Sequence, residues 1–92
     1  LAESRRLNED GMQQLEAGFG DLGLSWIPSK GNFIAVDLGR EAAPIFQGLL
    51  REGVIVRPVA NYGMPNHLRI TIGLPAENTR FLEALAKVLA RA

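Results

Sequence analysis

The sequence has 92 residues, 47% of them hydrophobic, and its ten basic residues balance its ten acidic ones. This length limits the chain to one domain, and the apolar fraction is that of a folded protein. The balanced charge, with no basic stripe or tail, argues against a nucleic-acid or acidic-membrane partner, and no apolar run is long enough to span a membrane.

Cysteine is absent, and the sequence contains a single histidine. Disulfides and thiolate chemistry are therefore excluded, and these residues offer no zinc-ligand set. The absence of cysteine agrees with a reducing compartment, so we expect a cytoplasmic protein. The charged, helix-like start differs from a secretory signal.

The first 20 residues or so predict an amphipathic helix. Hydrophobic residues recur at three- and four-residue steps, as in Met12, Leu15 and Phe19. Gly11 and Gly18 interrupt this pattern, and they either weaken the helix or permit close packing on a neighbouring element.

Two strands and a second helix follow. The apolar segments 24–28 and 33–38 flank a turn at 29–32, which predicts a hairpin or a pair of neighbouring strands. The second strand has enough apolar character on both faces to be central in a sheet. A helix is then expected over 42–51, and Gly53 is suited to end it.

The remaining sequence predicts two more strands and a final helix. Segments 54–58 and 68–73 are rich in β-branched residues and are joined by a stretch containing Gly and Pro. Pro75 begins the last helix at its first turn, where a missing N–H costs little. The order α-β-β-α-β-β-α does not alternate strictly. We therefore expect a single α+β domain over 1–92, with helices covering one face of a mainly antiparallel sheet.

Each of the last two predicted strands carries one arginine among apolar neighbours. Because side chains alternate along a strand, Arg69 faces away from Leu68 and Ile70, and Arg57 ends the neighbouring strand. Two guanidinium groups on adjacent strands suit an anionic ligand, since a planar fork binds carboxylate or phosphate through paired hydrogen bonds. The alternative is that both are edge residues that reach water or pair with a surface acid. The pattern alone leaves both interpretations open.

A catalytic set is not evident in the sequence. His67 lies in a predicted loop with no compelling nucleophile beside it, and we interpret it as solvated. Lys30 lies in a glycine-containing turn with no apolar pocket to lower its pKa, so we interpret it as a surface residue. Asn61 and Tyr62 receive no role. We assign no catalytic, cofactor-binding or metal-binding residue, so the chain is expected to bind a ligand but not to react with it.

Two blocks of sequence resemble the carboxy-terminal part of histidinol-phosphate aminotransferases. One is Gly-Val-Ile-Val-Arg-Pro at 53–58, and the other is Leu-Arg-Ile-Thr-Ile-Gly at 68–73 followed by Pro75, Glu77 and Asn78. Residues 28–33, Pro-Ser-Lys-Gly-Asn-Phe, are similar to the Ser-x-x-Asn-Phe motif of the same family. Leu74 departs from the small hydroxyl residue expected before the proline, which removes a helix cap worth about 1 kcal/mol.

The resemblance implies a fold-type-I enzyme that uses pyridoxal 5′-phosphate and works as a homodimer. It would transfer an amino group between histidinol phosphate and 2-oxoglutarate in histidine biosynthesis. The chain would be the small domain of a longer polypeptide, whose large domain holds the Schiff-base lysine and the rest of the cofactor site. By position, Arg69 matches the arginine that grips a substrate carboxylate, and Arg57 matches the one near the substrate phosphate.

Three alternatives remain open from sequence. The first is a close relative, either threonine-phosphate decarboxylase or an aromatic or broad-specificity aminotransferase. The second is a stand-alone α+β module that binds a small regulatory molecule, although such modules usually repeat a βαβ order. The third is a structural interaction domain in which both arginines are surface residues, and arginines lying far apart would favour it.

Overall fold

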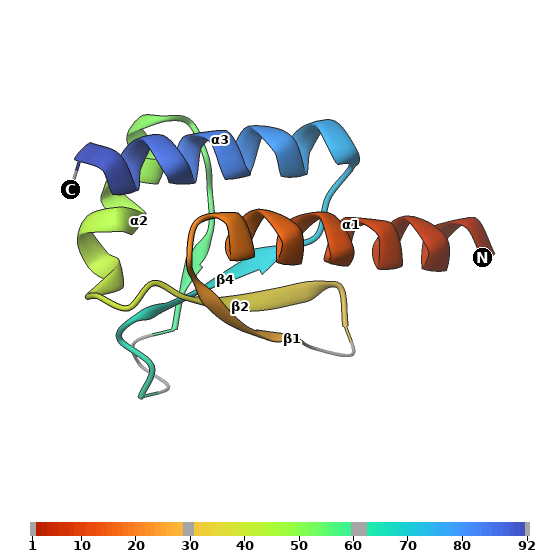
Figure 1. Cartoon of the computed structure of the whole chain (residues 1–92), viewed down its shortest axis with the longest axis horizontal. Helices are drawn as coiled ribbons and strands as arrows, with labels where there is room; N and C mark the ends of the chain where they lie inside the picture. Colours follow the sequence, from red (N-terminus) through yellow and green to blue (C-terminus); the bar gives the residue numbers. More distant parts are fainter. Residues whose placement is uncertain (1, 29–30, 60–62, 92) are drawn as a thin grey trace.

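Three helices cover one face of a four-stranded sheet in the computed structural model, which describes residues 2–28, 31–59 and 63–91 (Figure 1). The elements in chain order are helix α1 (Ala2–Asp21), strands β1 (Ser25–Pro28) and β2 (Phe33–Asp37), helix α2 (Ala42–Arg51), strands β3 (Arg57–Pro58) and β4 (His67–Thr71), and helix α3 (Pro75–Arg91). The predicted α+β class and element order are confirmed.

The strands lie in the order β1-β2-β4-β3, and all neighbouring pairs are antiparallel. Strand β2 is central, as its apolar sequence predicts. Its register places Ala35 opposite Arg69 of β4, while Arg57 of β3 lies opposite Arg69 on the other side. Alternation along β4 buries Leu68 and Ile70 beneath the helices, so the residues between them face away from the helical layer.

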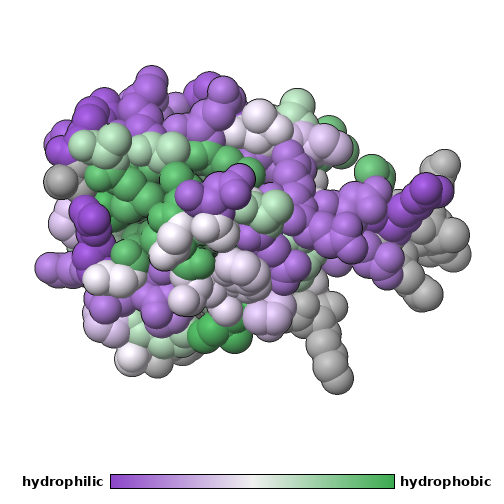
Figure 2. Space-filling view, viewed as in Figure 1, coloured by the Kyte–Doolittle hydropathy of each residue, from purple (hydrophilic) through white to green (hydrophobic). Residues whose placement is uncertain are grey.

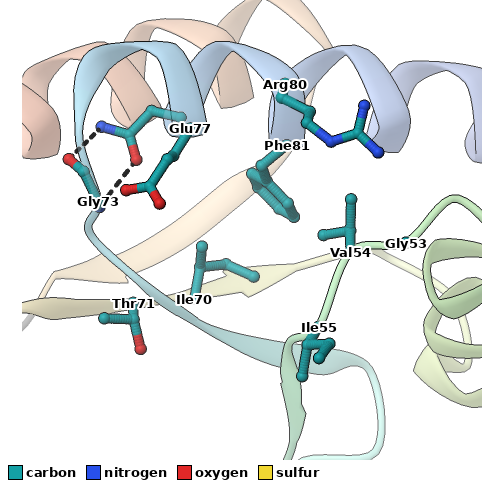
Figure 3. Close-up of a pocket in the computed structure, with 10 residues that line it drawn as sticks. Gly53, Val54, Ile55, Ile70, Thr71, Gly73, Glu77, Arg80 and Phe81 are labelled. Atoms are coloured by element: carbon teal, nitrogen blue, oxygen red, sulfur yellow. Dashed lines mark hydrogen bonds between the residues drawn. The ribbon is translucent and has the colours of Figure 1, made fainter.

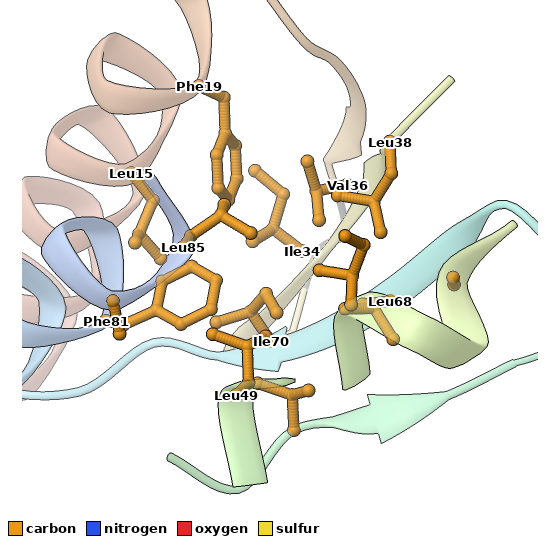
Figure 4. Packing of buried hydrophobic residues seen from close by; sticks show 14 of the residues in the cluster. Leu15, Phe19, Ile34, Val36, Leu38, Leu49, Leu68, Ile70, Phe81 and Leu85 are labelled. Carbon is orange, nitrogen blue, oxygen red and sulfur yellow. The ribbon is translucent and has the colours of Figure 1, made fainter. Parts of the chain in front are cut away.

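The hydrophobic core lies between this sheet and the helices (Figure 4). Helices α1 and α3 run side by side in the same direction (Figure 1). Phe19 of α1 and Phe81 of α3 meet edge to face with their ring centroids 6.2 Å apart. The largest side chains that are fully buried come from all three helices and the two central strands: Leu15, Phe19, Ile34, Val36, Ile45, Leu49, Leu68 and Leu85.

The two glycines within α1 serve close packing. A Cβ built on Gly18 would lie 2.5 Å from Cδ1 of Leu82, and one built on Gly11 would collide with Cγ2 of Ile72. Real Cβ atoms do not approach other atoms so closely, so the missing side chains let α1 press against α3 and the end of β4. Of the two roles that the sequence left open for these glycines, packing is the one that the structure shows.

The predicted strand over 54–58 is wrong in its first part. Only Arg57 and Pro58 pair with β4, because the preceding segment turns away from the sheet edge. Val56 points into the core, whereas Ile55 is 86% exposed. A run of β-branched residues reports how side chains pack and not whether the backbone pairs, which is why the pattern overestimates this strand.

Polar side chains cover much of the surface in the view of Figure 2, and apolar ones gather in the region where α2 lies beside α3. Within the described ranges, none of the helices combines the length and the hydropathy needed to cross a bilayer. In the same residues, His, Asp and Glu side chains do not cluster in a way that could hold a metal ion.

Candidate functional site

Arg57 and Arg69 lie on the sheet face that points away from the helices. They are directly opposite each other in the β3–β4 ladder, and opposed residues of antiparallel strands project from the same face. Like charges in this arrangement destabilise a sheet. Among the described residues, the ion pairs involve Glu52 and Asp37, so neither arginine is neutralised by an acid. The structure thus brings the two predicted residues together on an open cationic face.

Arg69 is partly sequestered and incompletely bonded. Its Cζ atom lies 4.8 Å from the centroid of the Phe33 ring, and its Nε atom is buried without a hydrogen-bond partner. A guanidinium group carries five N–H donors, and leaving a buried donor unpaired costs about 1–3 kcal/mol. Such a group is suited to an anion that supplies the missing acceptors. The contact between Phe33 and Arg69 could not be predicted from the local sequence pattern, because the two residues are 36 positions apart and the fold sets their register.

A histidine and an aspartate lie at one end of the same face. His67 is the first residue of β4 and not a loop residue as predicted, and it lies opposite Asp37 in the ladder. Its Nε2 atom is 3.9 Å from Oδ2 of Asp37, and its Nδ1 atom is buried without a partner. The other carboxylate oxygen of Asp37 accepts a hydrogen bond of 2.9 Å from the backbone N–H of Gly39. Sequence reasoning missed this pair, since only the strand register brings the two side chains together.

A cleft of about 360 Å³ opens where the chain before β3 leaves the edge of β4 (Figure 3). Val54, Ile70 and Phe81 give it an apolar lining, and Glu77 and Arg80 add charge. These charged groups already hold backbone atoms: Glu77 accepts from the N–H of Leu74 at 2.8 Å, and Arg80 donates to the carbonyl of Glu52 at 2.8 Å. Because its polar groups are engaged within the fold, this cleft is a weaker candidate than the arginine face.

A buried asparagine fixes the end of β4, which carries Arg69. Asn78 of α3 is 3% exposed, and its Oδ1 accepts from the N–H of Gly73 at 2.9 Å while its Nδ2 donates to the carbonyl of Gly73 at 3.0 Å. Nδ2 also donates to Oε1 of Gln14 on α1 at 3.1 Å. The strand end, α1 and α3 are therefore tied at one point. In the sequence Asn78 stands out only as part of the motif that follows Pro75, and the local pattern does not predict these contacts.

The described residues do not form the principal binding site for pyridoxal phosphate. A Schiff base requires a lysine, and Lys87 lies on α3, in the helical layer, where it bonds Glu52 at 3.3 Å. Lys30 and the adjoining Ser29 lie outside the described residues, as do Asn61 and Tyr62. The arginine face matches the anionic groups of a substrate better than it matches this cofactor.

Fold and face together define an α+β domain with two arginines on an uncovered sheet surface. Residues 1–85 match the family of aminotransferases of class I and II, so the chain belongs to this family.

One curated protein and two solved structures illustrate the similarity. The chain is 96% identical over 92 residues to histidinol-phosphate aminotransferase 2 of Pseudomonas fluorescens strain Pf-5, covering 100% of this chain and 25% of that protein. The structure of histidinol-phosphate aminotransferase from Sinorhizobium meliloti in complex with pyridoxal-5′-phosphate superposes with a TM-score of 0.86 at 28% identity, over 98% of this chain and 26% of that one. The structure of L-threonine-O-3-phosphate decarboxylase from Porphyromonas gingivalis gives a TM-score of 0.82 at 26% identity, over 94% and 28% of the two chains.

The resemblance to histidinol-phosphate aminotransferases that the sequence predicted is therefore confirmed. The chain spans about a quarter of the length of the curated relatives that it matches.

Proposed function

We propose that this chain is the substrate-gripping small domain of a pyridoxal-phosphate-dependent histidinol-phosphate aminotransferase. The observation that carries the proposal is the Arg57–Arg69 pair, which lies on one open sheet face and is not neutralised by an acid from the described residues. The near identity to a histidinol-phosphate aminotransferase supports this assignment of substrate.

The chemistry of the two substrates suits two guanidinium groups. Histidinol phosphate carries a phosphate, and 2-oxoglutarate carries carboxylates. In the proposal Arg69 grips the carboxylate of the oxo acid, and Arg57 lies near the phosphate. A guanidinium fork orients a planar or tetrahedral anion through paired hydrogen bonds, so each substrate is held in a fixed pose for reaction.

The rest of the longer polypeptide would supply the reactive half of the site. Pyridoxal phosphate, held there, provides the electron sink for the chemistry of the substrate carbon. The small domain would close its arginine face over the bound substrate and exclude water. A homodimer and a large domain in the same chain are part of this proposal, as is the cytoplasmic location expected from the absence of cysteine.

A second candidate is a threonine-phosphate decarboxylase. The chain resembles the Porphyromonas gingivalis enzyme at 26% identity and a TM-score of 0.82, which keeps this substrate class under consideration. L-threonine-O-3-phosphate carries a carboxylate and a phosphate in one molecule, so the same arginine pair would suit it. The purely structural alternative predicted arginines that lie far apart, and the observed register does not favour it.

A substrate panel tests the proposal. A full-length protein that contains this chain, loaded with pyridoxal phosphate, is assayed with L-histidinol phosphate and 2-oxoglutarate, and separately with aromatic amino acids and 2-oxoglutarate. Carbon dioxide release from L-threonine-O-3-phosphate is measured in parallel. The proposal predicts the highest kcat/KM for histidinol phosphate. Carbon dioxide release with no amino transfer would instead identify the decarboxylase.

A further inference from the structure

An aromatic ring supports one of the two arginines on the open sheet face. The Arg69 Cζ atom lies 4.8 Å from the ring centroid of Phe33, well inside the distance at which a cation is attracted to an aromatic face. The contact joins two strands, because Phe33 begins β2 and Arg69 is in the middle of β4. No corresponding contact is found for Arg57 among the described residues.

The residue between them leaves room for this contact. Ala35 lies directly opposite Arg69 in the ladder, and Phe33 lies two positions before it on the same face of β2. Ala35 is therefore the cross-strand neighbour of Arg69 beside its diagonal contact with Phe33, and a single methyl group there offers little obstruction. The small side chain of Ala35 and the ring of Phe33 therefore both favour this position of the Arg69 guanidinium.

We propose that Phe33 is a positioning residue, whose ring holds the Arg69 guanidinium on the open face before a substrate carboxylate arrives. This inference rests on the function proposed above, in which Arg69 grips that carboxylate. A free arginine side chain samples many rotamers, and fixing it upon binding weakens affinity. The ring removes part of this freedom in advance. Phe33 thus acts on substrate binding through Arg69 and touches no reacting atom.

The test compares two substitutions in the full-length protein loaded with pyridoxal phosphate. Phe33→Leu keeps an apolar side chain but loses the aromatic face, and it should raise KM for 2-oxoglutarate by about two- to thirtyfold, the range allowed by the strength of a cation–π contact. Because the lost interaction contributes to binding rather than to the chemical step, kcat should change little. Phe33→Tyr keeps the ring and should remain within about twofold of the wild type.

A matched control separates positioning from stability. Phe46→Leu makes the same change at an aromatic residue of α2 that packs against the core from the helical side. It should lower the melting temperature and leave KM unchanged. If Phe33→Leu lowers the melting temperature with KM unchanged, or if Phe33→Tyr raises KM as much as Phe33→Leu, the positioning role is refuted.

Two further variants keep the result decisive. If Phe33→Leu does not fold, Ala35→Leu places a branched side chain beside Arg69 and should raise KM with the ring intact; an unchanged KM would overturn the inference. The Arg69→Lys variant shows whether a negative result refutes the role of Phe33 or the proposed role of Arg69. A raised KM in Arg69→Lys with a normal KM in Phe33→Leu refutes the role of Phe33 alone. A normal kcat/KM in Arg69→Lys refutes the assignment of Arg69 itself.

Discussion

Asn78 is the described polar side chain that the core encloses most completely, at 3% exposure. Its side-chain oxygen and nitrogen both form hydrogen bonds with the backbone of Gly73, and the nitrogen also donates to Gln14. Buried amides are tolerated only when they are bonded in this way. The position of Arg69, four residues before Gly73, therefore depends on a residue that never approaches the open face.

Replacing Asn78 with alanine should destabilise the fold. The substitution leaves the N–H and carbonyl of Gly73 without their partner, and an unsatisfied buried group costs about 1–3 kcal/mol. Urea unfolding measures the difference. The control is Gln13→Ala, which removes an exposed amide from α1 and should change stability by less than about 0.5 kcal/mol. Equal stabilities of the Asn78→Ala and Gln13→Ala variants would contradict the role given to Asn78.

At the scale of the elements, the packing of α1 decides whether replacing one of its glycines by alanine stabilises the fold. Glycine is about 1 kcal/mol less favourable than alanine within a helix, so a substitution by alanine should stabilise an exposed position. Gly20 is such a position, since a Cβ there would meet nothing within 4 Å. Gly11 differs, because a Cβ there collides with Ile72.

The two substitutions should therefore have opposite signs. Gly20→Ala is expected to raise the free energy of unfolding by up to about 1 kcal/mol. Gly11→Ala is expected to lower it by about 1–2 kcal/mol, since overpacking exceeds the gain in propensity. Chemical denaturation of both variants provides the comparison. A stabilising effect at Gly11 would show that α1 is not pressed against the end of β4.

A charged cluster joins α2 to α3. The Glu52 carboxylate, just after α2, bonds Lys87 at 3.3 Å and Arg91 at 3.0 Å on α3. Its hydrogen bonds to Lys87 and then to Arg91 hold the pKa of Glu52 below its ordinary value of 4.5. A folded-state pKa below the unfolded value means that the ionised carboxylate stabilises the fold above pH 4.5. This contribution is lost as the pH falls through the lowered pKa.

The pH dependence of a Glu52→Gln variant follows from this sign. At neutral pH the variant should melt below the wild type, and the gap should close as the pH decreases below 4.5. Melting temperatures from pH 7 to pH 2 give the measurement. Glu9→Gln, an exposed change on α1 with no ion pair among the described residues, serves as the control and should show no such gap. A gap that is constant down to the lowest pH would mean that the ion pairs contribute nothing.

Element type could be predicted from sequence much better than strand pairing. The 3.6-residue periodicity around Leu15 and Phe19, together with Pro75 and Gly53 at helix ends, located all three helices. The strand over 54–58 was overestimated because propensity cannot tell Val56, which packs in the core, from a residue whose backbone is paired.

For the candidate site too, single residues could be predicted from sequence but their contacts could not. Arg57 and Arg69 could be proposed from sequence because each is a charge within an apolar strand. The contacts that complete the face could not: Phe33 with Arg69, and His67 with Asp37, meet only through the antiparallel register of distant segments. Register depends on the whole sheet, so local pattern does not determine it.

At the scale of the whole molecule, one face of the sheet is covered and the other is open. The helices bury the apolar face of β2 and β4, while the opposite face displays two arginines that the described residues do not neutralise. A folded domain gains nothing in stability from opposed like charges. In the function proposed above, an anionic substrate would supply the missing counter-charge on this open face.

Steady-state kinetics of Arg69→Lys in the full-length protein, with histidinol phosphate and 2-oxoglutarate, test this account most directly. Lysine keeps the positive charge but loses the planar fork, so kcat/KM should fall by roughly tenfold to a thousandfold. Arg6→Lys, the same change at an exposed residue of α1, should leave kcat/KM unaltered. If the Arg69→Lys protein turns over both substrates as efficiently as the Arg6→Lys protein, the open sheet face does not grip the substrate.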